Sequence, residues 1–368
     1  MNRGANMKTH RHRYEGRMHL FALLLMLGSS ASVLAADPQL DLTFGERGQL
    51  SQLVSPYDVQ VDKNGNLLVA DCGGKALYEF TPDGKPYAAF GRNGRLKIPD
   101  ASHPPMAVRV DEDGNVYTTG PFHNCTKFDQ TGKRLMAFGG WFTDATGAML
   151  TGATAMTCGI GLGKDKLYVF EGGGAGGPSV FKRNAPDREG FLYRPSKGLA
   201  LYGPILPKAI SSHYGYVGPA GKSTTTGILY VCTMGSELWK LTDTGSDIVR
   251  NYATNAGPDG VTMKNPTGLD IGPDGSVWVA DWGNGRIIRF NDTGTGLNAT
   301  WQFGVRGEGK LEAGQFMNPH SVAISPDGKS FYVAEDGEPV YDYTKRDATA
   351  NYGNHRVSKW IISAGPDK

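Results

Sequence analysis

NPTGLDIGPDGSVWVADWGNGRIIRF, residues 265–290, contains one complete structural unit. Pro266 opens an alternating apolar run, and such alternation is typical of a half-buried β-strand. The Pro-Asp-Gly sequence at 273–275 predicts a tight hairpin, because proline fixes φ and glycine accepts a positive φ. A second strand follows over 277–280, and a third ends the stretch. Three short antiparallel strands are too thin to bury their faces alone, so this unit must stack against copies of itself.

Copies of the unit recur along the chain. The clear copies occupy residues 55–80, 104–128 and 318–336, and the last of them closes at 355–360. The hairpin glycines Gly65 and Gly114 lie 49 residues apart, and Gly275 and Gly328 lie 53 apart. The interval between Gly114 and Gly275 has room for two degenerate copies, which we assign to residues 164–170 and 227–232. The sequence therefore predicts six units of four strands.

The fourth strands and the chain ends predict how the array closes. Several units end in a Phe-Gly pair that we expect to finish the fourth strand: Phe90-Gly91, Phe138-Gly139 and Phe303-Gly304. Residues 42–48 echo residues 301–307 and are predicted to form an unpaired outer strand, whereas the last unit has no Phe-Gly strand of its own. Pairing the N-terminal strand with the last unit would seal a ring without exposed edges. The alternative is an open array.

The recurring pattern Pro-x-x-Val-x-Val-Asp, Gly-Asn, Val-Ala-Asp and Phe resembles the NHL repeat family over roughly residues 41–362. The resemblance implies a six-bladed β-propeller. The predicted fold class is therefore all-β, with six four-stranded antiparallel blades in one domain that spans residues 37–368. Net charge is only +2, which gives no reason to expect a nucleic-acid partner.

Residues 1–36 are predicted to be a signal peptide. Basic residues precede the apolar stretch 20–27, and small residues precede Asp37. The apolar stretch is too short to span a bilayer. We expect a monomer, periplasmic or secreted, without stable membrane insertion after signal removal; the alternative is a retained anchor.

Four cysteines fit an exported protein, because their even number permits disulfide bonds. Cys72 and Cys125 are expected on the same rim of neighbouring blades, so Cys72–Cys125 is the preferred bridge. Cys158–Cys232 would then join the third and fourth units. The alternative is four buried thiols.

One face of the predicted ring collects polar side chains, because antiparallel strands bring the starts of first strands and the ends of second strands together. The second strands end in the candidate ligand-binding residues Asp71, Glu171, Asp281 and Glu335. Histidines stand at or before three first strands: His103, His213 and His320. The insertion 336–354 on this face is a predicted lid or specificity loop, and it carries Tyr341, Tyr343 and Arg346.

The opening Pro319-His320 supports a second resemblance, to the peptidyl-α-hydroxyglycine α-amidating lyases. These are six-bladed propellers of this repeat type that hold zinc with three histidines from alternate blades. The resemblance implies that His320 is a zinc ligand, and His103 and His213 are further candidates that lack the same motif. Tyr341 or Tyr343 would act as the general base.

Structural alternatives stand beside these roles. The histidines are then unrelated rim residues that bond to backbone or water. An aspartate after Val-Ala commonly accepts backbone N–H groups of the next turn, which is the alternative for Asp71 and Asp281. Calcium in the central channel is a further possibility, because a propeller axis collects carbonyl and carboxylate oxygens.

Two functions follow from these observations. The first is an exported propeller that acts as a binding scaffold for a protein, a peptide or a glycan on the face with the histidines and the 336–354 insertion. The alternative is a metal-dependent lyase or hydrolase that uses zinc. Sequences typical of other chemistries are absent: the chain has no G-x-S-x-G, no P-loop and no H-E-x-x-H.

Overall fold

The computed structural model describes residues 37–98, 104–120, 125–139, 157–171, 178–186, 189–194, 227–233, 235–308, 311–335 and 355–362. All of these residues belong to one compact unit, Ala35–Lys368. The predicted signal peptide lies outside the described residues and stays a prediction.

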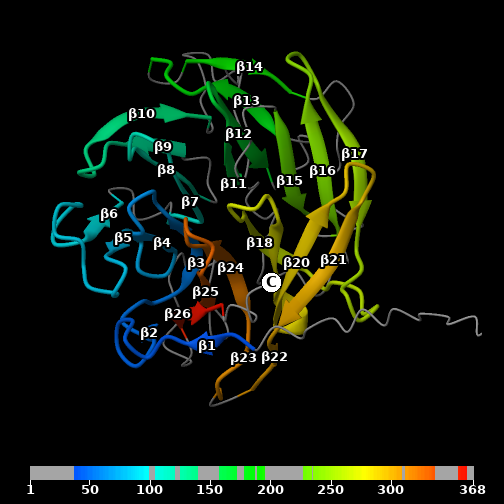
Figure 1. The fold of residues 1–368 in the computed structure, drawn as a ribbon. Helices are drawn as coiled ribbons and strands as arrows, with labels where there is room; N and C mark the ends of the chain where they lie inside the picture. Colours follow the sequence, from blue (N-terminus) through cyan, green and yellow to red (C-terminus); the bar gives the residue numbers. More distant parts are fainter. Residues whose placement is uncertain are drawn as a thin grey trace, which may run out of the picture. The chain divides into compact units, whose positions relative to one another are not determined.

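The described strands form the six predicted blades (Figure 1). Blade one consists of β3 (Pro56–Val61), β4 (Leu67–Asp71), β5 (Ala76–Phe80) and β6 (Arg95–Lys97). Blade two consists of β7 (Ala107–Val110), β8 (Val116–Thr119), β9 (Cys125–Phe128) and β10 (Arg134–Phe138). Blade three consists of β11 (Thr157–Leu162), β12 (Lys166–Glu171), β13 (Ser179–Lys182) and β14 (Phe191–Tyr193).

The remaining blades follow the same antiparallel order. The described strands of blade four are β15 (Ile228–Cys232), β16 (Leu238–Asp243) and β17 (Ile248–Thr254). Blade five consists of β18 (Pro266–Ile271), β19 (Val277–Asp281), β20 (Arg286–Asp292) and β21 (Leu297–Phe303), with the 3-10 turn η1 (Trp282–Asn284) after β19. Blade six contains β24 (Pro319–Ile324), β25 (Ser330–Glu335) and β26 (Arg356–Ile361). The short strands β22 (Val305–Arg306) and β23 (Gln315–Phe316) pair in parallel between blades five and six.

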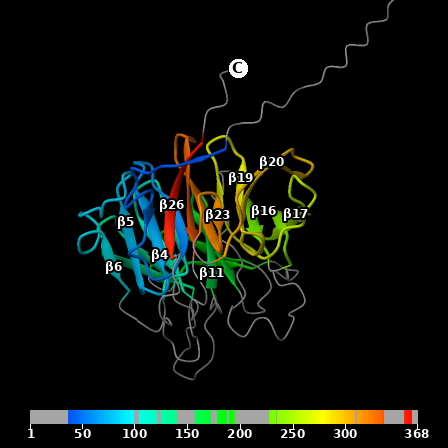
Figure 2. The same cartoon turned by 90° about the horizontal axis from the view of Figure 1, so that it is seen from below.

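Hydrophobic side chains fill all six interfaces between neighbouring blades. Six separate clusters each combine residues of two adjacent blades, from blades one and two round to blades six and one. The inner strands β3, β7, β11, β18 and β24 lie near the middle of Figure 1, and Figure 2 shows the strands running between the two faces of the ring. Six interfaces for six blades make a closed propeller, as predicted.

The N-terminal segment closes the ring on blade six. β1 (Gln39–Leu40) and β2 (Gln49–Leu50) both pair with β26, so the predicted sharing of one blade by the two chain ends is confirmed. The predicted strand 42–48 is wrong in detail. It forms turns between β1 and β2, because Phe44 leaves the sheet edge and is fully buried between blades six and one.

The predicted ending of blade one at Phe90-Gly91 is wrong in the same way, because Phe90 is buried in a turn and the outer strand β6 comes after it. In blades two and five the predicted ending is correct: Phe138 ends β10 and Phe303 ends β21.

The predicted hairpin turns are confirmed at the four strong repeats. Gly65, Gly114, Gly275 and Gly328 have φ between +70° and +86°, a region that side chains with a Cβ seldom adopt. The connections between the first and second strands in these four blades are all five residues long.

No disulfide bond is formed among the described residues. Cys72 and Cys125 are both buried thiols, so the bridge predicted between them is not present in this structure. The chain packs both side chains at 0–1 % exposure in the hydrophobic interior, which fits the alternative of buried thiols. Burial also raises the pKa of the Cys232 thiol; the side chain of its predicted partner Cys158 lies outside the described residues.

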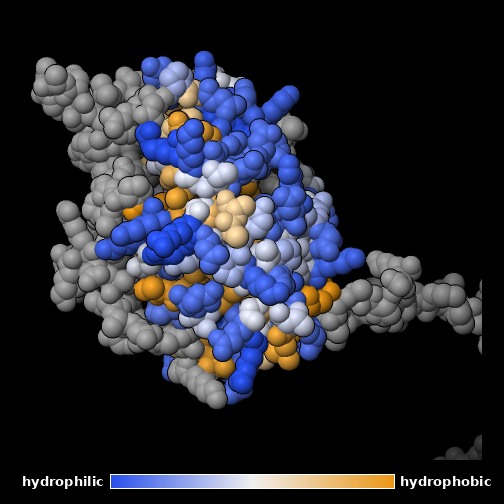
Figure 3. Space-filling view, turned by 90° about the vertical axis from the view of Figure 1, so that its left-hand side faces the viewer, coloured by the Kyte–Doolittle hydropathy of each residue, from blue (hydrophilic) through white to orange (hydrophobic). Residues whose placement is uncertain are grey.

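The surface in Figure 3 is mostly hydrophilic, with hydrophobic residues in small scattered groups. This view faces the side of the molecule that lies at the left of Figure 1, where β6 and β10 are the outer strands. Within the described ranges, no helix has the length and apolar character needed to cross a membrane.

Candidate functional site

The acidic residues at the ends of the second strands accept hydrogen bonds from the backbone just before the first strands. Asp71 accepts the backbone N–H groups of Ser55 at 2.7 Å and of Val54 at 3.1 Å, just before β3. Asp281 accepts the N–H of Lys264 at 2.7 Å, just before β18. The same position in blade six behaves alike.

In blade six, Glu335 accepts the N–H of Met317 at 2.9 Å, just before β24. All three carboxylates are 0 % exposed. Their oxygen atoms bind the protein's own backbone, but mainly in the connection before the first strand and not in the following turn that the alternative for Asp71 and Asp281 names. Of that turn, the N–H of Gly74 donates to Asp71 at 3.1 Å. Each carboxylate thus fixes the segment that leads into the first strand of its blade.

Blade one differs from blades five and six in how this carboxylate is neutralised. Arg286 and Arg356 donate to Asp281 and Glu335, both at 2.7 Å. The strand register puts Ala76 at the corresponding place opposite Asp71. Burial raises the pKa of Asp71, and the backbone N–H donors of Ser55, Val54 and Gly74 oppose this rise.

His320 lies inside the ring rather than on an open rim. Its side chain is 2 % exposed and stacks on Tyr57 of blade one, with ring centroids 4.3 Å apart. Its carbonyl oxygen accepts the hydroxyl of Thr267 at 2.9 Å. A Cβ at Gly268 would lie 2.4 Å from the same oxygen, so the inner strands of blades five and six touch here.

The predicted metal ligands His103 and His213, the catalytic candidates Tyr341 and Tyr343 and the ligand-binding candidate Arg346 lie outside the described residues. Glu171 is the last residue of β12, and its side chain is not among those described. Within the described part of the chain, no three His, Cys, Asp or Glu side chains are grouped to hold a metal ion. Zinc and calcium binding therefore stay predictions.

A buried ion pair joins the inner strands of three consecutive blades. Arg109 of β7 contacts Asp58 of β3 at 2.7 Å, and both side chains are at most 3 % exposed. Ser321 of β24 donates to the same carboxylate at 2.6 Å, and the N–H of Val108 does so at 2.9 Å. Sequence analysis missed this network, which fixes blades six, one and two against one another.

The two faces of the ring differ in the length of their connections. On the face where second strands end, residues 336–355 connect β25 to β26, whereas residues 282–285 suffice to join β19 to β20. On this face too, residues 139–156 connect β10 to β11. On the opposite face, the four strong repeats all use five-residue hairpins. The opposite face also carries the longer connections 81–94 and 183–190, but connections as long as 139–156 and 336–355 attach to the predicted binding face.

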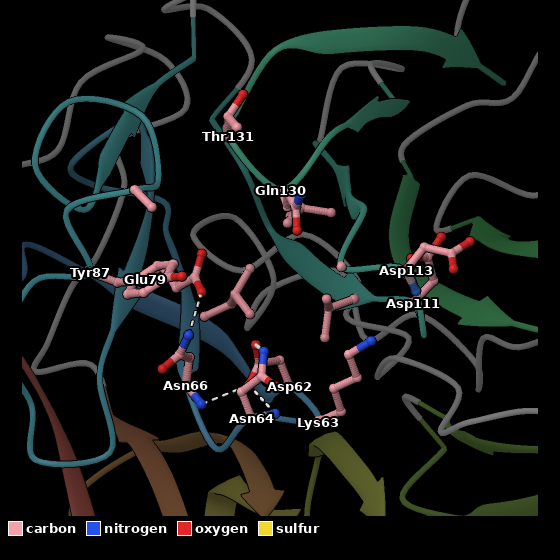
Figure 4. A pocket seen from close by; sticks show the side chains of 15 residues that line it. Asp62, Lys63, Asn64, Asn66, Glu79, Tyr87, Asp111, Asp113, Gln130 and Thr131 are labelled. Carbon is pink, nitrogen blue, oxygen red and sulfur yellow. Dashed lines mark hydrogen bonds between the residues drawn. The ribbon is translucent and has the colours of Figure 1, made fainter.

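Two cavities lie on the opposite face, each between adjacent blades. We call the one between blades one and two the acidic groove; its volume is about 250 Å³. Figure 4 shows Glu79 and Asn66 on one side of it and Asp111 and Asp113 on the other. The apolar residues Leu68, Val110 and Val116 also line it.

The second cavity, the tryptophan groove, lies between blades five and six and has a volume of about 380 Å³. Trp278 and Trp301 line it, with ring centroids 5.2 Å apart. Arg289 contacts Asp274 at 2.6 Å on the same wall. Pro38 and Ile362, which flank β1 and β26, complete the lining.

The two grooves occupy equivalent places in the repeat. The register pairs Leu68 with Glu79 in blade one and Trp278 with Arg289 in blade five. The corresponding pairs in the other blades are Tyr117–Lys127, Tyr168–Val180, Tyr230–Lys240 and Tyr332–Lys359. Five blades therefore carry an aromatic residue at the first position and four carry a cation at the second. Blade one alone has an aliphatic residue and an acid.

Glu79 is the groove residue that sequence reasoning missed. Alignment of YEF at 78–80 with the third-strand endings of the other strong units places Glu79 against Lys127, Arg289 and Lys359. A single acid among cations at one repeat position is therefore a signal that the sequence contains. Its burial becomes apparent only from the packing of blade two against blade one.

Comparison with known proteins identifies the repeat. Residues 263–290 match the NHL repeat, which covers the unit that contains β18, β19 and β20. The chain is a six-bladed β-propeller with an NHL repeat. A search of curated proteins found no match by sequence.

Solved structures similar to this NHL-repeat propeller support the fold. A chain of the mitotic checkpoint complex is 11 % identical with a TM-score of 0.52, covering 99 % of both chains. The calcium-binding protein regucalcin from Agrobacterium tumefaciens is 14 % identical with a TM-score of 0.50, covering 89 % of this chain and 95 % of its own. The Cps50 (Swd1) propeller domain from Myceliophteria thermophila is 12 % identical with a TM-score of 0.50, covering 84 % and 83 %. At these identities the likeness concerns the fold alone.

Proposed function

We propose that this propeller is an exported binding scaffold whose ligand is a protein, a peptide or a glycan. The observation that carries the proposal is the asymmetry of the connections. On one face the first and second strands of four blades are joined by five residues each, and residues 81–94 form the longest connection described there, whereas the other face carries longer connections such as residues 139–156 and 336–355. Long connections on a rigid scaffold are where binding residues concentrate.

The buried carboxylates support this division of roles. Asp71, Asp281 and Glu335 each fix the backbone at the root of the binding face, and none of them is exposed. Because the backbone at the base of these connections is already fixed, the connections lose less conformational entropy when a ligand binds. The acids thus act as supports, and the ligand contacts belong to the connections between them.

The test is capture of partners from the envelope and extracellular fractions of the source cells. A variant without residues 338–352 should lose a partner that the intact protein retains, since this deletion shortens the longest connection of blade six. Arg289→Gln, on the opposite face, is the matched control and should retain it. Probing glycan and peptide arrays with the same three proteins extends the test to small ligands. Retention of every ligand by the shortened protein contradicts the proposal, as does the absence of any ligand in all formats.

A further inference from the structure

The acidic groove contains a carboxyl group that the fold itself does not use. Glu79 is 6 % exposed, and one of its oxygens accepts the side-chain amide of Asn66 at 2.9 Å. Among the described residues no second hydrogen bond and no cation reaches this carboxyl. Figure 4 shows it turned toward the space between the two blades. Burial removes most of the water that would hydrate the ionised carboxylate, and no described cationic side chain compensates for this loss.

The other blades show what is missing at this position. In blade two, Lys127 lies over the ring of Tyr117, with its ammonium 5.1 Å from the centroid. In blade six, Lys359 lies 5.8 Å from the ring centroid of Tyr332. These blades fill the place between strands with their own cation. Blade one supplies neither the cation nor the aromatic ring, whereas the equivalent cavity of blade five is lined by both Trp278 and Arg289. The acidic groove therefore has a carboxyl group where the other cavity has its own cation.

The charges around the groove favour a positive ligand. Asp62 and Asp113 face it from the two hairpins, together with Asp111. Arg183 partly neutralises the last of these from blade three, at 3.0 Å. Among the described residues of the lining, Lys63 is the one cationic side chain, and its ammonium donates to the carbonyl oxygen of residue 112 at 2.7 Å across the mouth. The remaining field in the groove is negative.

The walls of the groove set the shape of the ligand. Leu68 and Val116 are each 1 % exposed and form an apolar floor, and the ring of Tyr87 lines one side. Apolar walls that lead to one buried carboxyl suit a chain of methylene groups with a charged end. A compact metal ion would leave the partly buried Tyr87 and Val110 uncovered.

We propose that the acidic groove binds a primary ammonium group on an alkyl stem. The ammonium donates to Glu79, and the stem lies over the floor of Leu68 and Val116, against the partly buried Tyr87 and Val110. This chemistry has two sources, a free alkylamine or the side chain of a lysine in a peptide. The site lies on the face opposite the one proposed for the macromolecular ligand, so either proposal can fail without the other.

The first experiment measures binding of n-pentylammonium to the intact protein by titration calorimetry at pH 8. Saturable binding is expected, and Glu79→Gln should weaken it by about tenfold or more, because a charged acceptor becomes neutral. Arg289→Gln in the tryptophan groove should leave the affinity unchanged. Pentan-1-ol, with the same stem and no charge, should not bind.

The second experiment uses only the wild-type protein. It can therefore contradict the proposal even if the Glu79→Gln variant does not fold. Burial raises the pKa of Glu79 to about 7, opposed by the Asn66 bond and reinforced by Asp62. The ionised fraction therefore rises about tenfold between pH 6 and pH 8, and the affinity for the ammonium should rise by about the same factor. Binding at pH 7 should also release protons, which appears as heat that varies with the ionisation enthalpy of the buffer. The other charged groups facing the carboxyl are Asp62, Asp111, Asp113 and Lys63.

A third arm distinguishes the sources of the ligand. Nα-acetyl-lysine methylamide is compared with its Nε-acetylated form, which has no charge, and with the free amine. Tighter binding of the lysine derivative points to a peptide ligand, and tighter binding of the free amine points to a small metabolite. The proposal is overturned if neither binds at millimolar concentration, if the alcohol binds equally well, or if Glu79→Gln binds as the wild type does.

Discussion

The acidic groove and the tryptophan groove occupy equivalent positions in two repeats, but the charged side chains at these positions have opposite signs. In blade one the facing pair is Leu68 and Glu79, whereas in blade five it is Trp278 and Arg289. The backbone register is identical, so the difference comes from side chains alone. The repeat determines where a cavity can form, and departures from the repeat determine what the cavity can bind.

The two grooves also differ in what closes them. The tryptophan groove is lined by Pro38 and Ile362, close to both described ends of the chain. The acidic groove is lined by hairpin residues such as Gln130 and Thr131, far from either end. Changes at the chain ends should therefore affect one groove and leave the other intact.

The largest effect is expected from removal of residues 37–49. This deletion removes β1 and the fully buried Phe44, and it exposes the edge of β26. Loss of one buried phenylalanine alone costs about 3–5 kcal/mol, so we expect a larger total loss in the free energy of unfolding. Denaturant unfolding and thermal melting measure it. An unchanged melting temperature would show that the ring is not closed by this segment.

The next effect concerns the aromatic floor of the tryptophan groove. Trp278→Leu gives blade five the residue of blade one. It removes contacts with Trp301 and Phe331, at centroid distances of 5.2 and 5.6 Å, and the bond to Ser276. We expect a loss of about 3 kcal/mol in the free energy of unfolding.

Leu68→Ile is the conservative control in the acidic groove and should cost about 1 kcal/mol or less. Equal losses for the two variants would mean that the aromatic pair adds nothing to packing.

A smaller, pH-dependent effect is expected for Glu79→Gln. Because the pKa of Glu79 is raised from 4.5 to about 7, the folded protein holds this proton more tightly than the unfolded chain does. The resulting stabilisation is complete below pH 4.5 and is lost as the pH rises to 7. The raised pKa corresponds to about 3 kcal/mol, and solvent at the open groove screens part of it. Relative to wild type, the variant should therefore gain about 2 kcal/mol between pH 4.5 and pH 8.

Unfolding of both proteins in urea across this range gives the difference directly, and titrations shared by the two proteins cancel. A difference that does not change with pH would place Glu79 in water rather than in a desolvated site.

The smallest effect is expected for Arg289→Gln. Its ion pair with Asp274 joins side chains that are 32 % and 53 % exposed. Exposed pairs of this kind contribute about 0–1 kcal/mol, and salt screens them. The free energy of unfolding, measured in urea at high salt, should therefore change little. A loss clearly beyond that range would reveal that the guanidinium packs over Trp278 and contributes more than its charge.

Most of the fold could be predicted from the sequence, because each blade repeats local turn chemistry. The glycines at 65, 114, 275 and 328 mark hairpins that the structure contains. The prediction for residues 42–48 is wrong because Phe44 and Phe303 share a motif but not a position in the blade. Whether a Phe-Gly pair ends a strand or precedes one depends on packing against the next blade, which the local sequence does not encode.

The candidate site is less predictable than the fold. The chain order places Asp71 and Glu335 correctly at the strand ends, but their backbone partners come from the connection before the first strand. The sequence predicts His320 at a site-bearing rim, whereas its stacking on Tyr57 depends on the contact of blade six with blade one. Contacts between units that are far apart in the chain leave no local signal.

The shared blade at the chain ends has a consequence for how the protein matures. Leu40 pairs with Trp360, which lies about 320 positions later in the chain. The strand that contains Leu40 can therefore pair only after nearly the whole chain has been synthesised. Until blade six is complete, Phe44 has blade one beside it but lacks contacts that blade six supplies. Ring closure is then a late step of folding, and the molecule remains vulnerable to aggregation until β26 pairs with β1.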